Sequence, residues 1–586
     1  MADSMEQKAL PGATGDVPRT PGRRGAPLGV DATLGVILLC VIGIVTVAPV
    51  AYALITSFNV APFSEPYRFG LSGWQEVFSS GKTVKSIGYS FLLSIRIPIA
   101  VIIAFLIAWL LVRVQIPGSR FIEHALWFGF FLPALPITMG WILLLDQNYG
   151  LLNKLAQTLP FVTGPIFSIY SIPGILWVHI TLSTIPVMVI LLAPALRQLD
   201  AANEEAADIA GAPVRTTLLR ITIPLVAPAI LTATVAGFIR SLEVFEVEQI
   251  LGTPSNIFVY ATRIYDLISW EPPQINQAMA LSALFLGFLL IVAMAYQHLL
   301  GRFSARVAAS GKGARLQPRL KTWKAYLASA IIFSYIIIGI ILPLSVLLLG
   351  SCSKLYGFFF IEDAWTLDHW REVFADKNFL RASFNSLILG LLAGGLGTLL
   401  YALVAWVLVR RRVWGANLIS LFTWLPWAVP GLVLGISLLT LMLNSPVLSV
   451  VHGTIVPLIV AMIIKDMPLG VQMIRSALYQ VPREMEESAA VLGARFATVF
   501  FKIVLPLIAP MLLAVFLLMF VATLRDISTI VLLAGPGTRT LSLVMFEFAN
   551  SGRFESAAVI GVLVALMSLI IIAIAFRFNP KFGATH

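Results

Sequence analysis

The sequence predicts an all-α membrane protein of about twelve transmembrane helices, arranged as two tandem, parallel six-helix halves. Three observations support this prediction. Of the 586 residues, 59% are hydrophobic and 12% are charged, and this charged fraction is about half that of a soluble domain. Apolar runs long enough to cross a bilayer occur repeatedly. Short landmarks in the first half of the chain recur in the same order in the second half.

The apolar runs place six spans in each half. They cover residues 33–57, 89–113, 124–146, 172–195, 226–250 and 276–300, and then 326–350, 382–409, 417–443, 454–475, 508–533 and 554–577. The first thirty residues are rich in Pro, Gly and Arg, a composition typical of disorder. The predicted domains are a disordered cytoplasmic tail (1–30), a first transmembrane domain (31–301), a basic cytoplasmic linker (302–325), a second transmembrane domain (326–577) and a cytoplasmic tail (578–586).

Basic residues gather in loops that would share one side of the membrane. They lie in the linker, in the Arg410-Arg411-Arg412 run after the eighth span, and in the N-terminal tail at Arg19, Arg23 and Arg24. The positive-inside rule makes that side the cytoplasm, so both termini are expected there. The same rule accounts for the net charge of +11, and nucleic-acid binding is not indicated.

The landmarks indicate a tandem duplication. An even number of spans in each half makes the two copies parallel, related by an axis along the membrane normal. A translocation pathway would then follow the seam between the halves. The outward loops 58–88 and 351–381 are interpreted either as interfacial helices or as a platform for a soluble partner. The matched landmarks are Trp74-Gln-Glu-Val-Phe with Trp370-Arg-Glu-Val-Phe, Ala108-Trp109 to Arg113 with Ala405-Trp406 to Arg410, and Phe131-Leu-Pro133 with Trp424-Leu-Pro426.

One polar, acidic stretch occurs twice between the apolar runs. The first copy reads Glu204-Glu205-Ala206-Ala207, then Gly211 and Pro224; the second reads Glu486-Glu487-Ser488-Ala489, then Gly493 and Pro506. Each proline follows its glycine by the same number of residues. Good helix formers before each glycine predict a short helix, and the glycine suits a left-handed residue that ends it. Such an exposed helix–Gly–helix elbow is a docking surface rather than a catalytic site.

This pattern resembles the EAA loop in the permease subunits of binding-protein-dependent ABC importers. The resemblance implies the type I importer transmembrane fold in a bacterial inner (plasma) membrane. Two copies of an ABC ATPase would dock on the elbows around 204–225 and 486–507, and a periplasmic or extracellular substrate-binding protein would meet the outer loops. Ser488 replaces the first copy's Ala206, with no expected loss of docking. The implied coupling residues are Glu204, Glu205, Ala206, Ala207, Gly211, Pro224, Glu486, Glu487, Ala489, Gly493 and Pro506.

The chain offers no nucleotide-binding loop of its own. Ser80-Gly81-Lys82-Thr83 looks like the end of a phosphate-binding loop, but Glu76 stands where the first glycine is required. ATP and Mg are therefore expected on separate ATPase subunits. The two cysteines and six scattered histidines offer no metal-ligand spacing. No cofactor, metal or catalytic residue is expected in this chain.

Charged residues inside or beside predicted spans have two interpretations. Intramembrane charge is costly and normally faces a partner or a cavity. The charges either form salt bridges that hold the bundle, or Glu243, Glu246, Arg525 and Asp526 line the translocation path. The prolines and glycines of the third spans are interpreted as helix kinks or hinges. The full set of charges is Arg96, Arg240, Glu243, Glu246, Glu248, Lys465, Asp466, Arg525 and Asp526.

Among importer permeases, fused two-domain chains of this length look most like those for ferric iron. Thiamine, 2-aminoethylphosphonate and polyamine are the alternatives within the class. A secondary transporter of the major facilitator type shares the span count, but the loop after the second span lacks that family's Gly-rich Asp-Arg pattern. A membrane-embedded enzyme would need a catalytic cluster at a span end, and the sequence contains none.

Overall fold

The computed structural model describes residues 28–61, 65–114, 116–199, 202–307, 322–411 and 413–578. Most of the two predicted tails, much of the predicted linker, and Arg19, Arg23, Arg24 and Arg412 lie outside these described residues. Within the described ranges the chain is helical, apart from two isolated β-bridges, Asn59 with Phe69 and Ser353 with Trp365. The predicted all-α class is confirmed.

Helices of the first half carry the spans, the outer helices and the first elbow. They are α1 (Leu28–Thr56), α2 (Ser72–Ser79), α3 (Gly81–Leu93), α4 (Arg96–Trp109), η1 (Leu110–Val114), α5 (Ser119–Phe131), α6 (Ala134–Leu145), α7 (Leu151–Ala156), α8 (Ile172–His179), η2 (Ile180–Thr184), α9 (Ile185–Gln198), α10 (Ala202–Ile209), α11 (Val214–Thr217), η3 (Leu218–Thr222), α12 (Ile223–Glu243), α13 (Glu246–Leu251), η4 (Thr253–Ser255), α14 (Tyr260–Ile268) and α15 (Ile275–Val307).

Helices of the second half repeat this order. They are α16 (Thr322–Ile336), η5 (Ile337–Ile341), α17 (Leu342–Ser351), α18 (Asp368–Ala375), α19 (Lys377–Arg410), α20 (Ala416–Trp424), η6 (Leu425–Ala428), α21 (Gly431–Leu443), η7 (Ser449–Val451), α22 (Val456–Gln480), α23 (Glu484–Val491), α24 (Phe496–Val499), η8 (Phe500–Val504), α25 (Leu505–Leu507), α26 (Ala509–Arg525), α27 (Ile530–Leu533), α28 (Leu541–Asn550) and α29 (Phe554–Phe578).

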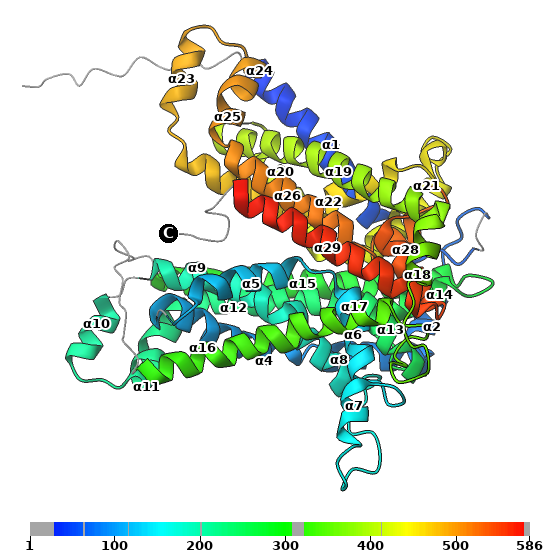
Figure 1. Ribbon diagram of the computed structural model, residues 1–586. Coiled ribbons are helices and arrows are strands. Elements are labelled where there is room, and N and C mark those ends of the chain that lie inside the picture. The colour runs from blue at the N-terminus through cyan, green and yellow to red at the C-terminus, as the bar shows by residue number, and fades with distance from the viewer. Residues whose placement is uncertain are drawn as a thin grey trace, which may run out of the picture.

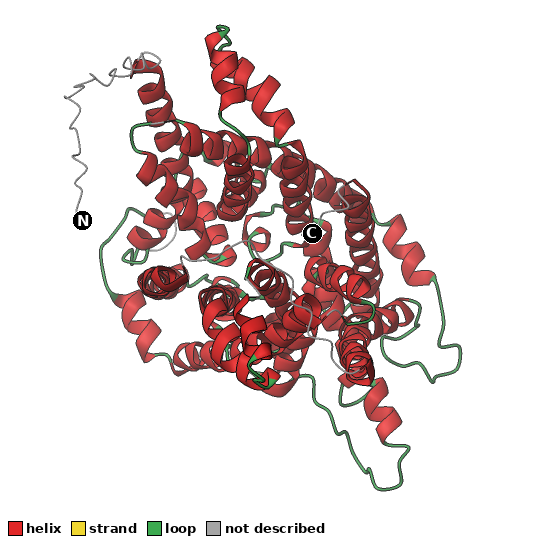
Figure 2. Ribbon diagram, turned by 90° about the vertical axis from the view of Figure 1, so that its left-hand side faces the viewer, coloured by secondary structure: helices red, strands yellow, loops and turns green. Residues whose placement is uncertain are grey.

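The helices supply the predicted number of spans. Eight are long and apolar enough to cross a bilayer, and four bent pairs bring the total to twelve if each pair counts as one span. The long helices run in one common direction, with the elbow helices α10 and α23 at one end of the bundle and α2, α14 and α18 at the other (Figure 1). Figure 2 looks along many of these helices from the elbow end. Both elbows therefore face the same side, as parallel halves require.

The third span of each half is broken rather than kinked. Its two pieces meet at 99° in the first half (Ser119–Phe131 with Ala134–Leu145) and at 108° in the second (Ala416–Ala428 with Gly431–Leu443). Pro133 and Pro430 sit at the breaks in extended conformation. A proline lacks an N–H donor and disfavours helix at the preceding residue, so the helix stops and restarts in a new direction. Pro133 and Pro430 thus mark breaks between two helices, which are sharper than the expected kinks. The hinge role stays a prediction.

The fifth spans also differ from the prediction of continuous helices over 226–250 and 508–533. The first begins inside the elbow at Val214 and ends at Glu243, where Val244 is extended. The second is bent by 80° between Phe496–Leu507 and Ala509–Arg525. Glu246 and Glu248 therefore lie on the short helix α13, and Asp526 lies on the turn that follows α26, beyond the straight part of each span.

The first span of each half packs on the other half. Helix α1 contacts α20 and α21, and α16 and α17 contact α5 and α6. The contact of α17 with α6 is close: a Cβ on Gly140 would lie 2.2 Å from the carbonyl oxygen of Pro343. The Tyr335 hydroxyl adds a 3.1 Å hydrogen bond to the carbonyl of Ile180. This exchange ties together the two transmembrane domains, whose boundaries remain a prediction.

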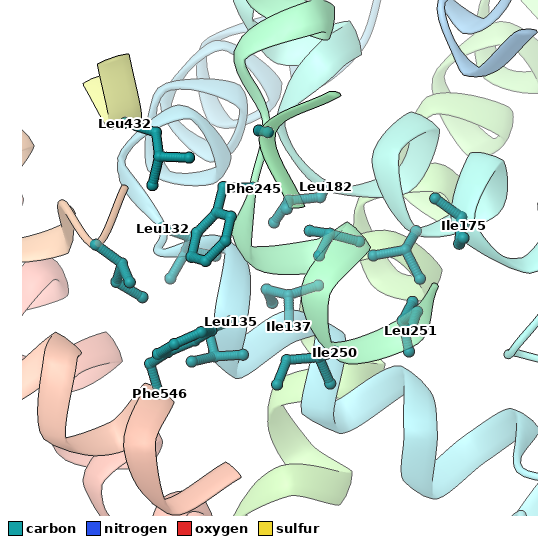
Figure 3. Close-up of a cluster of buried hydrophobic side chains, with 14 of the residues drawn as sticks. Leu132, Leu135, Ile137, Ile175, Leu182, Phe245, Ile250, Leu251, Leu432 and Phe546 are labelled. Atoms are coloured by element: carbon teal, nitrogen blue, oxygen red, sulfur yellow. The ribbon is translucent and has the colours of Figure 1, made fainter. Parts of the chain in front are cut away.

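Apolar side chains fill the seam between the halves near the outer ends of the fifth spans (Figure 3). The rings of Phe245, from the first half, and Phe546, from the second, lie 5.4 Å apart. Leu432 at the start of α21 joins the same cluster as Leu132 and Leu135. Each of these five side chains is at most 2% exposed, so the seam is closed at this level.

Candidate functional site: two elbows and a charged seam

Each elbow is a short helix stopped by a left-handed glycine. Gly211 has φ +76° and Gly493 has φ +82°, and a Cβ on either would meet nothing within 4 Å. The amide of Ala212 donates to the carbonyl of Ala207 at 2.9 Å, and that of Ala494 to Ala489 at 3.0 Å. This six-residue closure is the Schellman ending, which needs positive φ at the glycine. The predicted left-handed role of both glycines is confirmed.

The first elbow helix, α10, is tied to the end of the second span by a buried ion pair. Arg113 Nε lies 3.2 Å from Glu204 Oε2, with side chains 3% and 8% exposed. The guanidinium also donates to the Leu199 carbonyl at 2.8 Å, and Thr222 Oγ1 donates to Glu204 Oε1 at 2.5 Å. Because a buried carboxylate is costly unless it is paired, Glu204 holds α10 in one position.

The second elbow repeats this anchor with different supporting groups. Arg410, the last residue of α19, places Nε 3.0 Å from Glu486 Oε1. It also donates to the carbonyls of Leu478 and Val481 at 2.9 and 2.6 Å. Trp406 Nε1 donates to Glu486 Oε2 at 2.8 Å, in the place that a threonine takes in the first half. The same arginine–glutamate anchor therefore occurs twice.

The outward faces of the elbows are apolar and accessible. Ile209 is 88% exposed and Val491, its counterpart, 87% exposed. Beside the first elbow an open hollow of about 330 Å³ is lined by Asn203, Arg220, Ile221, Pro224 and Leu225. A rigid helix with an exposed apolar end beside a hollow is a surface shaped for a partner protein.

The predicted elbow residues divide between an inner and an outer face. Ala207 and Ala489 are buried beside their anchoring glutamates, whereas the remaining predicted residues face outward. Pro224 lies in the first turn of α12 and Pro506 in α25, and both are exposed. The exposed predicted residues are Glu205, Ala206, Gly211, Glu487 and Gly493.

The second span is also joined to an outer helix at its far end, again in both halves. Ser90 Oγ of α3 accepts a hydrogen bond from the Tyr260 amide at the start of α14, at 2.8 Å. Ser386 Oγ of α19 accepts from the Leu541 amide at the start of α28, at 2.7 Å. Each second span thus connects its elbow on one side of the bundle with an outer helix on the other side.

A second cluster of charges lies at the seam. Lys465 of α22 forms an ion pair with Asp526, and its ammonium group also donates to Thr529 Oγ1 at 3.1 Å. The other oxygen of Asp526 accepts the Thr529 amide at 3.0 Å. The Asp526 side chain is 6% exposed. These contacts to Asp526 all come from its own half.

The other predicted path residues are held less firmly. Arg240 lies 3.7 Å from Glu243, with side chains 59% and 13% exposed, as predicted for a pair three residues apart. Arg525 crosses the seam to donate to the Phe130 carbonyl at 2.6 Å. Glu243 of the first half is thus held by a longer ion-pair contact than Asp526 of the second half.

One buried cluster includes a histidine that the sequence did not single out. Glu248 Oε1 lies 2.8 Å from His179 Nε2 and 3.6 Å from Arg96 Nη1. Arg96 also donates to the Ser241 carbonyl at 3.0 Å. All three ionisable side chains are at most 5% exposed. Their spacing in the sequence carries no signal, because three separate helices bring them together.

Comparison with known proteins shows which family the chain resembles. Residues 386–583 match the family model described as "Binding-protein-dependent transport system inner membrane component". A ferric transport system permease protein FbpB of Actinobacillus pleuropneumoniae is 27% identical over 71% of this chain and 60% of its own length. A second ferric permease, of Haemophilus influenzae, is 28% identical and likewise covered over 60% of its length. The chain thus spans about three fifths of these two relatives.

Another relative aligns over nearly its whole length. An Fe(3+)-transport system permease protein, FbpB 2 of Haemophilus influenzae, is 24% identical over 91% of this chain and 96% of its own. Among solved structures, a bacterial alginate ABC transporter covers 45% of this chain at 20% identity with a TM-score of 0.37. The family model matches the second half of the chain, and these relatives make the chain similar to the multi-pass inner-membrane permease components of binding-protein-dependent ABC importers.

Proposed function

We propose that this chain forms the membrane pathway of an ATP-driven importer and that two copies of an ABC ATPase dock on α10 and α23. The observation that supports this most is the duplicated elbow. In both copies an arginine–glutamate pair holds the inner face, buried in the first half and half-buried in the second, while Ile209 and Val491 are exposed on the outer face. An exposed apolar surface that recurs in both halves fits a motor that has two equivalent subunits.

We propose further that the second span carries the motion across the membrane. Helix α19 has 34 residues, which is about 51 Å at 1.5 Å per residue. Its inner end is tied to α23 through Arg410 and Glu486, and its outer part to α28 through Ser386. Closure of the ATPase pair would displace both elbow helices, and the second spans would move α14 and α28 at the outer face. The halves would then alternate between inward-facing and outward-facing forms.

The cargo we propose is ferric iron, delivered by a periplasmic or extracellular binding protein. The support is the names of three relatives, each of which is about a quarter identical to this chain. In the described part of the chain no group of three or more His, Cys, Asp or Glu side chains could hold a metal ion. Selection would therefore rest mainly on the binding protein, with Glu243, Glu246, Arg525 and Asp526 giving passing contacts along the seam. Thiamine, 2-aminoethylphosphonate and polyamine are the alternatives.

The test is uptake by proteoliposomes that contain the chain with the ATPase that co-purifies with it. We expect uptake of ferric iron to require ATP, the ATPase and a binding protein. Glu205→Lys and Gly211→Val should leave the protein in the membrane but separate ATP hydrolysis from uptake. A matched control is Gly287→Ala in α15, where an added Cβ would meet nothing within 4 Å, and this variant should change neither. Ion-driven uptake by the chain alone would instead favour a secondary transporter of the major facilitator type.

Membrane orientation is part of the same proposal. We place both elbows and both termini in the cytoplasm, because the basic run at Arg410 and Arg411 and the elbows lie at one end of the bundle. An epitope at the N-terminus should resist protease in intact cells and be cleaved in inverted vesicles.

A further inference from the structure

The outer loop between the third and fourth spans of the first half forms an apolar hairpin. It consists of α7 and the loop that leads from α7 back to α8. Phe161 is 78% exposed, Leu155 65% and Ile166 58%. Residues 147–178 contain a single charged side chain, Lys154. The corresponding loop of the second half, residues 444–455, is much shorter, so the hairpin belongs to one half alone.

The hairpin is built as a rigid unit around one buried amide. Asn153 is 1% exposed. Its Nδ2 donates to the carbonyls of Asp146 and Phe167 at 2.9 and 3.0 Å, and its Oδ1 accepts the amides of Ile166 and Phe167 at 3.0 and 2.9 Å. One side chain thus joins both arms of the hairpin to its base. The base of the hairpin, including the exposed Ile166, is therefore held by these hydrogen bonds.

The direction of the hairpin separates two kinds of partner. In Figure 1, α7 and its loop project sideways, across the direction of the long helices, close to the end of the bundle that carries α2 and α14. A direction across the spans lies parallel to the membrane plane. A soluble protein that sits on the outer face would approach along the spans and not from the side.

The hairpin is continuous with the lipid-facing surface of the bundle. Trp177 on the neighbouring helix α8 is 42% exposed and packs edge-to-face on Trp141, with centroids 5.4 Å apart. Aromatic side chains gather where acyl chains meet headgroups. Uncharged apolar residues that lie flat at this level match an interfacial element and not a water-exposed loop.

We infer that this hairpin, residues 147–168, is an interfacial anchor that inserts its apolar edge into the headgroup–acyl boundary of the outer lipid leaflet. It would hold the first half at a fixed depth while other parts of the bundle move. The inference does not depend on the proposed cargo or on the ATPase.

The test uses nitroxide labels on the full chain in phosphatidylcholine–phosphatidylglycerol nanodiscs, with Cys40→Ser and Cys352→Ser removing the native thiols. The label is placed by Phe161→Cys. Ile102→Cys, 63% exposed on the span helix α4, is the lipid reference. Glu362→Cys, on an exposed outer loop, is the water reference. Collision rates with oxygen and with a nickel chelate are measured for each label.

The expected result is high oxygen and low nickel accessibility at position 161, with nickel collisions several-fold below those at position 362. Nickel accessibility equal to that at 362 would place the hairpin in water and overturn the inference. Protection from both reagents would indicate a protein partner and would also overturn it. Should Phe161→Cys fail to fold, Ile166→Cys on the opposite arm gives the same readout.

Discussion

Glu204→Gln offers the sharpest test of the elbow anchor. The substitution keeps the shape of the side chain but removes its charge. Arg113 loses its carboxylate, 3.2 Å away, and keeps only the Leu199 carbonyl among its hydrogen-bond acceptors. Breaking a fully buried pair costs about 3–5 kcal/mol. This pair lies at the rim of the bundle, and the glutamine still accepts from Thr222, so we expect about 2–3 kcal/mol.

This loss should appear as local opening of α10, not as unfolding of the whole chain. Since about 1.4 kcal/mol corresponds to a factor of ten, amide exchange across residues 202–212 should become roughly 30- to 150-fold faster. Hydrogen–deuterium exchange of the full chain in nanodiscs measures this directly. Amides within α19 serve as an internal standard and should keep their rates.

The matched control is Glu205→Gln, the exposed neighbour on the same helix. A surface substitution of this kind changes stability by about 0.5 kcal/mol at most, so exchange should change by roughly twofold. Equal exchange in the two variants would refute the reasoning, because burial and pairing would then contribute nothing. Arg113→Glu combined with Glu204→Arg should recover part of the protection.

The other predictions concern backbone and charge. Gly211→Ala should destabilise the elbow by about 1–2 kcal/mol from positive φ alone, seen as faster exchange with an unchanged thermal midpoint. Gly140→Ala would place a Cβ 2.2 Å from the backbone of α17 and should lower the thermal midpoint in detergent by several degrees; Gly287→Ala, with nothing within 4 Å, should not. Asp526→Asn leaves Lys465 without its anion and should reduce both stability and uptake, whereas uptake equal to wild type would exclude Asp526 from the path.

The sequence was informative wherever a local pattern determines the structure. Span count follows from apolar length, and the left-handed glycines follow from the helix formers before them and from the recurrence of the same spacing. Both were confirmed by the structure. The pair of Arg240 and Glu243 was also foreseeable, because residues three apart share a helix face.

Features that depend on contact between distant segments were missed. Arg113 and Arg410 stood out as the ends of a repeated landmark, and Arg410 also as part of a basic run, but nothing local paired them with Glu204 and Glu486. The repetition itself was an available signal. In both halves an arginine ends the matched landmark of the second span, and a glutamate begins the acidic stretch of the elbow. His179 had no such signal, because its partners come from other helices of a single half.

The broken third spans show a different limit. A prediction based on apolar length treats the two helical pieces as one span. A proline within a span is compatible with either a kink or a break. The outcome depends on whether neighbouring backbone can accept the turned chain. Here Gly140 lets α17 approach α6 closely, and the broken geometry is retained. The packing of each first span on the opposite half likewise depends on tertiary contacts that no local sequence pattern specifies.

The most direct test of the central claim is maleimide labelling of Ile209→Cys and Val491→Cys in the chain lacking its native thiols. A membrane-impermeant maleimide is applied to intact cells and to inverted vesicles, with and without the co-purifying ATPase. The account predicts labelling of both positions only in inverted vesicles, and protection of both when the ATPase is bound. Labelling in intact cells, or labelling that the ATPase does not change, would contradict it.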